Sequence, residues 1–179
     1  MPSPIAHISV GYAMYLVVRR APGFLRTLRF VDWRLAVALV FFSLLPDADA
    51  APGLLTGDIG LFHNTISHSL LTGVAAAVFA AVAARLARLG SAWRWAIFAL
   101  LCCEIHILMD FVCHGRGVMA FWPLTSLRFR SPIVLFYGLH WSDGLISMNH
   151  VWTILTESVF GISLIWLVSR LPAGSSERG

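Results

Sequence analysis

Apolar residues dominate this chain in long runs, and Arg-rich or Pro/Gly-rich breaks separate these runs. Such runs are typical of helices that lie in a membrane. The pattern predicts helices over residues 5–18, 35–46, 69–89, 93–113 and 151–169. The last three are long enough to span a bilayer, whereas the first two, at roughly 12–14 residues or about 20 Å, fall short of a hydrocarbon core about 30 Å thick. We expect the two short helices to tilt into a thinned region or to end in a polar cavity below the membrane surface.

The stretch 114–150 interrupts this pattern because it is rich in Gly, Pro, Trp and Phe. It predicts a loop at the membrane interface, with its tryptophans at headgroup level. The expected fold class is therefore an all-α integral membrane protein with about five membrane helices, two of them short, and an interfacial outer loop. Residues 1–172 are predicted to form a single membrane-embedded domain, and residues 173–179 a disordered tail.

Composition agrees with this fold class. The chain is 58% hydrophobic and 12% charged, with a mean hydropathy of +0.78, which excludes a disordered chain and argues against a water-soluble domain. The three cysteines lie in or beside one apolar run without C-x-x-C spacing, and we interpret them as small buried hydrophobic residues.

The basic residues, all of them arginines, indicate how the chain is oriented. If the five helices alternate in direction, ten arginines share one side of the membrane and three, Arg116, Arg128 and Arg130, lie on the other. Because the arginine-rich side is normally cytoplasmic, we expect an inner-membrane, multi-pass protein with its N-terminus out and its C-terminus in. Because the excess of arginine, which gives the net charge of +4, is explained by orientation in the membrane, we expect no nucleic-acid partner.

Most of the His and Asp residues fall into four short clusters, and the same alternation of helices brings all four clusters to the outer side. The clusters are His7, Asp47 with Asp49, His63 with His68, and His106 with Asp110. Ionisable side chains are costly in lipid, so their presence indicates a functional site.

Two of these clusters have spacings that suit a metal ion. His106 and Asp110 are four residues apart on a predicted helix, so their side chains lie on one face and can bind one ion. The alternative is a buried, hydrogen-bonded His–Asp pair without metal. In Leu45-Pro-Asp-Ala-Asp49, Pro46 is expected to stop the helix, so that one carboxylate coordinates and the other bridges or orients a histidine. The alternative is a polar helix end at the interface.

The other two clusters supply histidines. His63 is expected to be a direct ligand, whereas His68 either ligates or donates a hydrogen bond to a substrate oxyanion. Thr65 or Ser67 is predicted to cap the helix that follows. His7 begins the first helix, where interfacial packing is its alternative role. Histidine and aspartate with few cysteines suit one or two divalent first-row metal ions, with zinc as the first choice.

Three further ionisable residues are less easily placed. Glu104 is two positions from His106, on another face of the helix, so it is expected to pair with a different helix. His114 is expected to border the cavity, and Glu157 needs a buried partner.

The order of these motifs, continued by Phe121-Trp-Pro-Leu124, resembles the YdjM type of LexA-binding, inner-membrane-associated metal-dependent hydrolases, over about residues 4–125. The chain departs from the family pattern at Asn64-Thr65, where Arg-Gly is usual, and at His114, where a Thr is usual. A weaker similarity to multi-zinc phospholipases C would make five of these residues ligands, with Asp110 bridging two metals. That ligand set is His7, Asp47, His63, His106 and Asp110.

These observations predict a membrane-bound metal-dependent hydrolase that acts on an ester or phosphoester. Asp49, Asp47 or His68 would serve as general base, and Arg116, Arg128 or Arg130 would hold an anionic headgroup. The expected partners are membrane lipid and a lipid-like anionic substrate. The alternatives are a metal-binding membrane carrier or channel and a non-catalytic regulatory membrane protein.

Overall fold

The chain folds into helices joined by loops. The structure, a computed structural model, describes residues 1–20, 33–57, 62–140 and 147–172. The main helices are α1 (Pro4–Arg19), α3 (Trp33–Leu44), α5 (Leu70–Leu86), α6 (Ala92–Phe111) and α7 (Met148–Ser169). The shorter ones are α4 (Ala50–Thr56) and the 3-10 turns Leu45–Asp49 and Ile66–His68. Within the described ranges no strand forms, so the all-α prediction is confirmed. The predicted tail, 173–179, lies outside the described residues.

Within the described ranges, three stretches are long and apolar enough to cross a membrane: Trp33–Gly53, Ala92–Phe111 and Met148–Ser169. The prediction of spanning length was therefore wrong for the second and third segments. The second is longer than expected because Pro46 occupies the start of a 3-10 turn, where a missing N–H is tolerated, and the chain remains helical into α4.

The third segment is shorter than expected, since α5 has 17 residues. Arg88 adopts a left-handed backbone conformation (φ 54°). Its N–H donates to the carbonyl of Arg85, and the N–H of Leu89 donates to the carbonyl of Ala84. This pair of bonds ends a helix, usually with glycine at the left-handed position. Because an arginine occupies the position where glycine is usual, the sequence does not indicate that the helix ends here.

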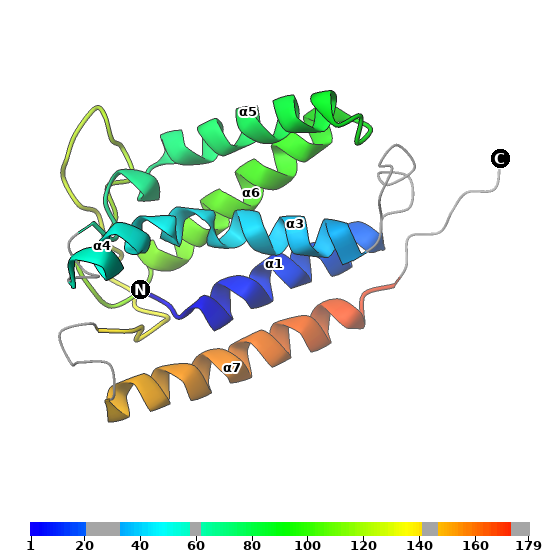
Figure 1. Ribbon diagram of the computed structural model, residues 1–179. Helices are drawn as coiled ribbons and strands as arrows, with labels where there is room; N and C mark the ends of the chain where they lie inside the picture. The colour runs from blue at the N-terminus through cyan, green and yellow to red at the C-terminus, as the bar shows by residue number, and fades with distance from the viewer. Residues whose placement is uncertain (21–32, 58–61, 141–146, 173–179) are drawn as a thin grey trace.

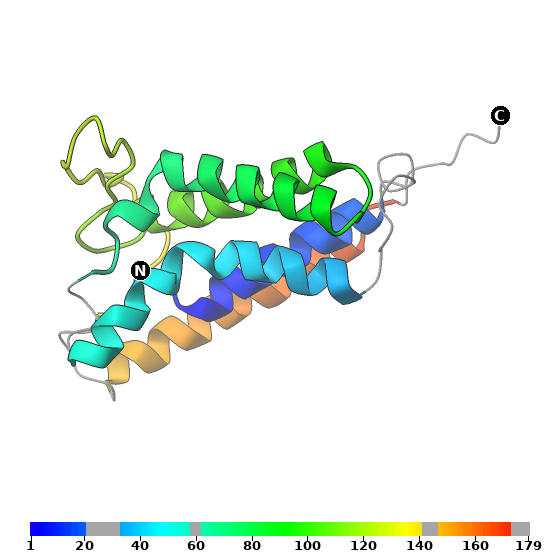
Figure 2. The same cartoon turned by 45° about the horizontal axis from the view of Figure 1, so that its top comes forward.

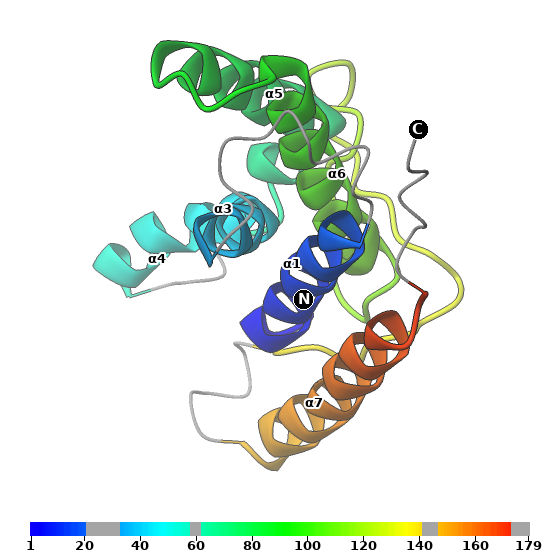
Figure 3. The ribbon, with the colours of Figure 1, turned by 90° about the vertical axis from the view of Figure 1, so that its right-hand side faces the viewer.

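The main helices run roughly along one axis and alternate in direction (Figures 1 and 2). One end of the bundle therefore collects the starts of α1, α5 and α7, the ends of α3 and α6, and the loop that follows α6. Viewed end-on, α1 lies between α3 and α7, and α5 packs on the far side of α6 (Figure 3). The alternation assumed from the sequence is thus observed, and it gathers the polar clusters at one end.

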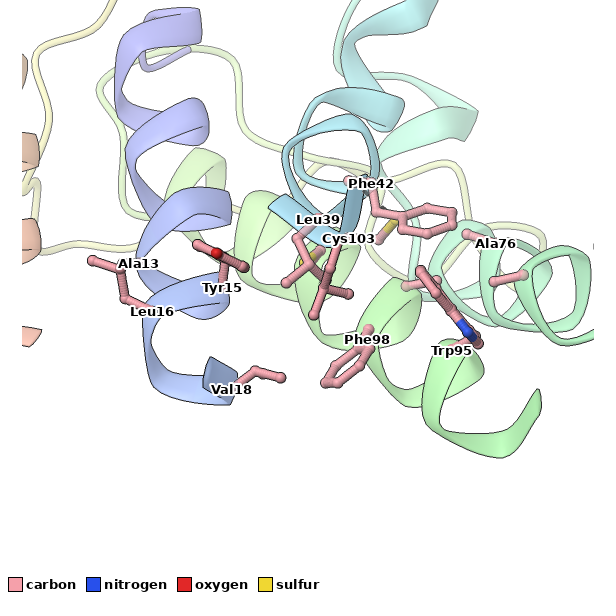
Figure 4. Packing of buried hydrophobic residues seen from close by; sticks show 14 of the residues in the cluster. Ala13, Tyr15, Leu16, Val18, Leu39, Phe42, Ala76, Trp95, Phe98 and Cys103 are labelled. Atoms are coloured by element: carbon pink, nitrogen blue, oxygen red, sulfur yellow. Dashed lines mark hydrogen bonds between the residues drawn. The ribbon is translucent and has the colours of Figure 1, made fainter. Parts of the chain in front are cut away.

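Away from that end the bundle is held by an apolar core (Figure 4). Leu39 of α3 packs towards Cys103 and Phe98 of α6, and the Phe42 ring points towards Ala76 of α5. The small residues Ala80 and Ala84 of α5 belong to the same core. All three cysteines are buried and free, as expected of small hydrophobic residues.

The contact between α1 and α3 positions the first histidine. A Cβ atom at Gly11 would lie 2.8 Å from Val40 Cα, so only glycine permits this approach. One turn away, the Ser43 hydroxyl donates a 2.6 Å hydrogen bond to the carbonyl oxygen of His7. These contacts fix the start of α1 against the end of α3.

Candidate metal centre

Seven His and Asp side chains from four separate segments meet at the polar end of the bundle. The predicted convergence is therefore observed for every residue of the candidate site: His7 on α1, Asp47 and Asp49 in the turn after α3, His63 and His68 before α5, and His106 and Asp110 on α6. The side chains of His7, His68, His106 and Asp110 are fully buried.

Four of these side chains surround a common point. The Nε2 atoms of His68 and His106 are 3.2 Å apart. Asp47 Oδ1 lies 3.6 Å from the first and 3.4 Å from the second. Asp110 Oδ2 lies 2.8 Å and 3.6 Å from the same two atoms. Ligands about 2.0–2.1 Å from a tetrahedral zinc ion are about 3.3 Å from one another, so these separations suit one ion.

Hydrogen bonds at the opposite ring nitrogens orient the imidazoles. His106 Nδ1 is 2.7 Å from the Ser43 carbonyl oxygen, which can only accept, so this nitrogen carries a proton, and the neutral ring has its lone pair on Nε2. His63 Nδ1 donates to Asp49 Oδ1 at 2.8 Å, and His68 Nδ1 faces Asp49 Oδ2 at 3.2 Å. The Ser67 hydroxyl donates to the same carboxylate. Carbonyl and carboxylate partners of this kind are typical of histidines that bind metals.

The remaining ligand atoms form a second group around Asp110. His7 stacks on His106 with ring centroids 3.7 Å apart, and its Nε2 is 4.0 Å from Asp110 Oδ1. Candidate ligand atoms lie within 4.8 Å of one another in two sets, one of Asp47, His63, His68 and Asp110, the other of His7, His106 and Asp110. Because Asp110 belongs to both sets, its carboxylate would serve as a ligand in each.

The cluster contains buried polar atoms without hydrogen-bond partners among the described residues. They include both ring nitrogens of His7, both carboxylate oxygens of Asp47 and of Asp110, and His63 Nε2. Asp110 Oδ2 is close to His68 Nε2, but the contact lacks the angles of a hydrogen bond. Burying polar groups without partners is costly. A divalent cation would satisfy these nitrogen and oxygen atoms together, so the residues fit the metal that the sequence predicts.

The electrostatics of the cluster also favour a positive charge at its centre. Burial alone would lower the pKa of His68, but the carboxylates of Asp110, Asp47 and Asp49 outweigh it and raise that pKa well above its ordinary value. A proton or a metal cation can supply this charge.

Several residues outside the cluster are placed differently from expectation. Neither Thr65 nor Ser67 caps α5, because a 3-10 turn intervenes and Ser69 takes the N-cap position. His114 is exposed and stacks on Tyr137, since α6 ends at Phe111 and the chain turns away from the cluster.

Two acids on the membrane helices, Glu104 (partly buried) and Glu157 (buried), have partners that the sequence did not name. Glu104 lies against α5, where a Cβ at Gly73 would meet its carboxylate, so the expected contact with another helix is confirmed. Glu157 accepts a 2.6 Å hydrogen bond from the backbone N–H of Ser3. Sequence reasoning also missed Ser43, although it lies one helical turn before Asp47 and is polar within an apolar run.

The fold and the site define a helical membrane protein with a buried His/Asp cluster at one end of its bundle. The family described as YdjM inner membrane protein matches residues 1–174, and the chain belongs to this family. The resemblance seen in the motifs is thereby confirmed. Comparison with curated proteins and with solved structures gives no match.

Proposed function

We propose that this protein is a metal-dependent hydrolase embedded in the inner membrane. The observation that carries the proposal is the orientation of the cluster. The Nδ1 atoms of three imidazoles contact Asp49, the Ser67 hydroxyl or the Ser43 carbonyl. This leaves three Nε2 atoms directed at the carboxylates of Asp47 and Asp110. A buried hydrogen-bonded pair without metal would not need this common orientation.

The residues have distinct proposed roles. A divalent cation, with zinc as the first choice, would supply Lewis acidity and make water a usable nucleophile near neutral pH. Asp47, His68, His106 and Asp110 would hold one ion, with His63 beside it on the Asp47 side, and His7 and Asp110 would contribute ligands to a second. We assign His68 to the ligands because its Nε2 atom lies among the other ligand atoms. Asp49 positions His63 and His68 and, being 10% exposed, is the proposed proton acceptor.

The loop after α6 indicates a lipid-like substrate. Its side chains include exposed apolar residues, among them Leu124 (90% exposed), Leu127 and Leu135. Such residues favour a position at the lipid interface, which would keep the open side of the cluster close to lipid headgroups. An ester or phosphoester lipid is the proposed substrate class.

The distribution of buried polar groups favours a hydrolase over a metal carrier. Among the described residues, the buried polar side chains gather towards the end of the bundle that holds the cluster. The core of the other half is apolar. A carrier would need polar groups that continue towards the opposite side.

We expect the cluster to face outward, because the arginine-rich end of a membrane bundle is normally cytoplasmic. The test uses a variant lacking the three native cysteines. In it, a cysteine at the exposed Ser126 should react with a membrane-impermeant maleimide in intact cells, and one at the exposed Ala87, in the α5–α6 turn, should react only after lysis. The reverse labelling would overturn the proposed orientation.

Hydrolysis itself is tested with purified, zinc-loaded protein and a panel of ester and phosphoester lipids. We expect the wild type to hydrolyse at least one of these lipids, EDTA to abolish the turnover and added zinc to restore it. The Asp110→Asn variant should show no turnover. Reconstituted vesicles should show no protein-dependent metal flux. Saturable flux without hydrolysis of any lipid in the panel would instead support the carrier.

A further inference from the structure

Arg128, in the loop after α6, is fastened to the edge of the cluster through one end of its guanidinium group. Its Nη1 donates hydrogen bonds to the carbonyl oxygens of Asn64, at 2.8 Å, and Gly117, at 3.3 Å. Asn64 directly follows His63 and is buried in a left-handed conformation (φ 58°). The anchor of Arg128 is thus a fixed backbone atom next to a candidate ligand.

The rest of the guanidinium group is available to a ligand. Within the described residues, Nε and Nη2 make no hydrogen bond, and the side chain is only partly buried. A guanidinium presents its N–H donors in a planar fork that matches two oxygens of a phosphate or carboxylate. Anchoring one nitrogen restricts the motion of this fork before a ligand arrives, which lowers the entropic cost of binding.

Arg128 also lies on the open side of the cluster. Residual exposure is found at Asp47 (13%) and Asp49 (10%), whereas the side chains of His7, His68 and Asp110 are fully buried. A ligand must therefore approach past these two partly exposed carboxylates. Burial and the neighbouring Arg116 lower the pKa of Arg128, while Asp49 opposes both, so Arg128 lies within electrostatic reach of Asp49. Two neighbouring arginines favour an anion between them.

We propose that Arg128, with Arg116 beside it, forms a phosphate-binding subsite next to the metal centre. This inference rests on the proposed function and narrows its substrate class from esters in general to compounds that carry a phosphate group. Arg128 would bind two phosphate oxygens through Nε and Nη2 and direct the phosphorus towards the ligand atoms of Asp47 and His68.

The binding test uses inorganic phosphate and the full-length, zinc-loaded protein in detergent, measured by calorimetry. A hydrogen bond between charged partners implies that Arg128→Gln should weaken phosphate binding by about tenfold or more. The control is Arg130→Gln, two residues away on the same loop, where the side chain is exposed and makes no hydrogen bond among the described residues. We expect it to bind phosphate as the wild type does, and both variants to retain their zinc.

A second measurement separates recognition from a loss of loop structure. Arg128→Gln should raise KM for a phosphoester but leave KM for an uncharged carboxyl ester unchanged, and Arg128→Lys should recover part of the loss. Equal effects on both substrates would show a merely structural role and overturn the inference. Binding of short-chain phosphatidic acid then shows whether the subsite recognises a free phosphate or a lipid headgroup. If Arg128→Gln weakens the binding of this lipid and of inorganic phosphate by similar factors, the subsite recognises the phosphate alone. If Arg128→Gln weakens only the binding of the lipid, the subsite needs the lipid headgroup.

The inference and the proposed function can fail separately. If the zinc-loaded wild type binds neither inorganic phosphate nor phosphatidic acid, or if Arg128→Gln and Arg130→Gln bind both of them alike, the subsite is refuted and the metal centre stands. If the wild type holds no metal, the hydrolase is refuted, and phosphate binding that still depends on Arg128 would support the subsite.

Discussion

His106→Ala and Asp110→Asn are each expected to remove most of the metal from the purified protein. Each variant loses a ligand atom from the group in which the His68 and His106 Nε2 atoms are 3.2 Å apart and Asp110 Oδ2 is 2.8 Å from the former. Asp110 also belongs to both candidate ligand sets, so its loss should affect two ions where two are bound. The measurement is metal per protein by mass spectrometry after desalting.

Glu104→Gln is the matched control for these two variants. Glu104 lies on the same helix but faces α5, so its substitution should leave the metal content unchanged. If both His106→Ala and Asp110→Asn kept the metal content of the wild type, the buried His–Asp pair without a metal role would be the better account.

Asp49→Asn is expected to abolish most of the hydrolysis while keeping part of the metal. The carboxylate accepts from His63 Nδ1 and faces His68 Nδ1, and an amide has only one oxygen to offer. The NH2 group of the asparagine would donate to Nδ1 of one of the two rings. That ring would then carry its proton on Nε2, the atom that should bind the metal. Metal affinity should fall by about 10–100-fold, and turnover at saturating zinc by a further factor of about 100 or more.

The control for Asp49→Asn is Glu157→Gln, which also neutralises a buried carboxylate but lies on α7, bound to Ser3. It should leave zinc affinity and turnover close to those of the wild type. An Asp49→Asn variant with wild-type turnover at saturating zinc would refute its role as proton acceptor.

Much of the fold was predictable because hydrophobic runs report directly on membrane helices. The five helices and their alternation follow from those runs, and alternation alone places four distant clusters at one end. Helix lengths were less predictable. The end of α5 depends on Arg88 in a conformation that usually requires glycine, and α3 continues into α4 through a proline that its position tolerates.

The residues of the site were predictable for a related reason, since ionisable groups in apolar runs are rarely without a role. Their geometry was not. The assignment of both His63 and His68 as ligands depends on both rings directing Nδ1 at Asp49, and the orientation of His106 depends on the Ser43 backbone carbonyl. Backbone carbonyls are present at every residue, so a sequence pattern cannot indicate which one accepts such a bond.

The central claim is that histidine and aspartate side chains at one end of the bundle hold a metal ion. X-ray absorption at the zinc edge of the zinc-loaded, desalted protein tests it most directly. We predict near-stoichiometric zinc with nitrogen and oxygen ligands at about 2.0–2.1 Å and scattering from imidazole rings. Failure to retain zinc after desalting, or a sulfur shell at about 2.3 Å from Cys102, Cys103 or Cys113, would contradict the account.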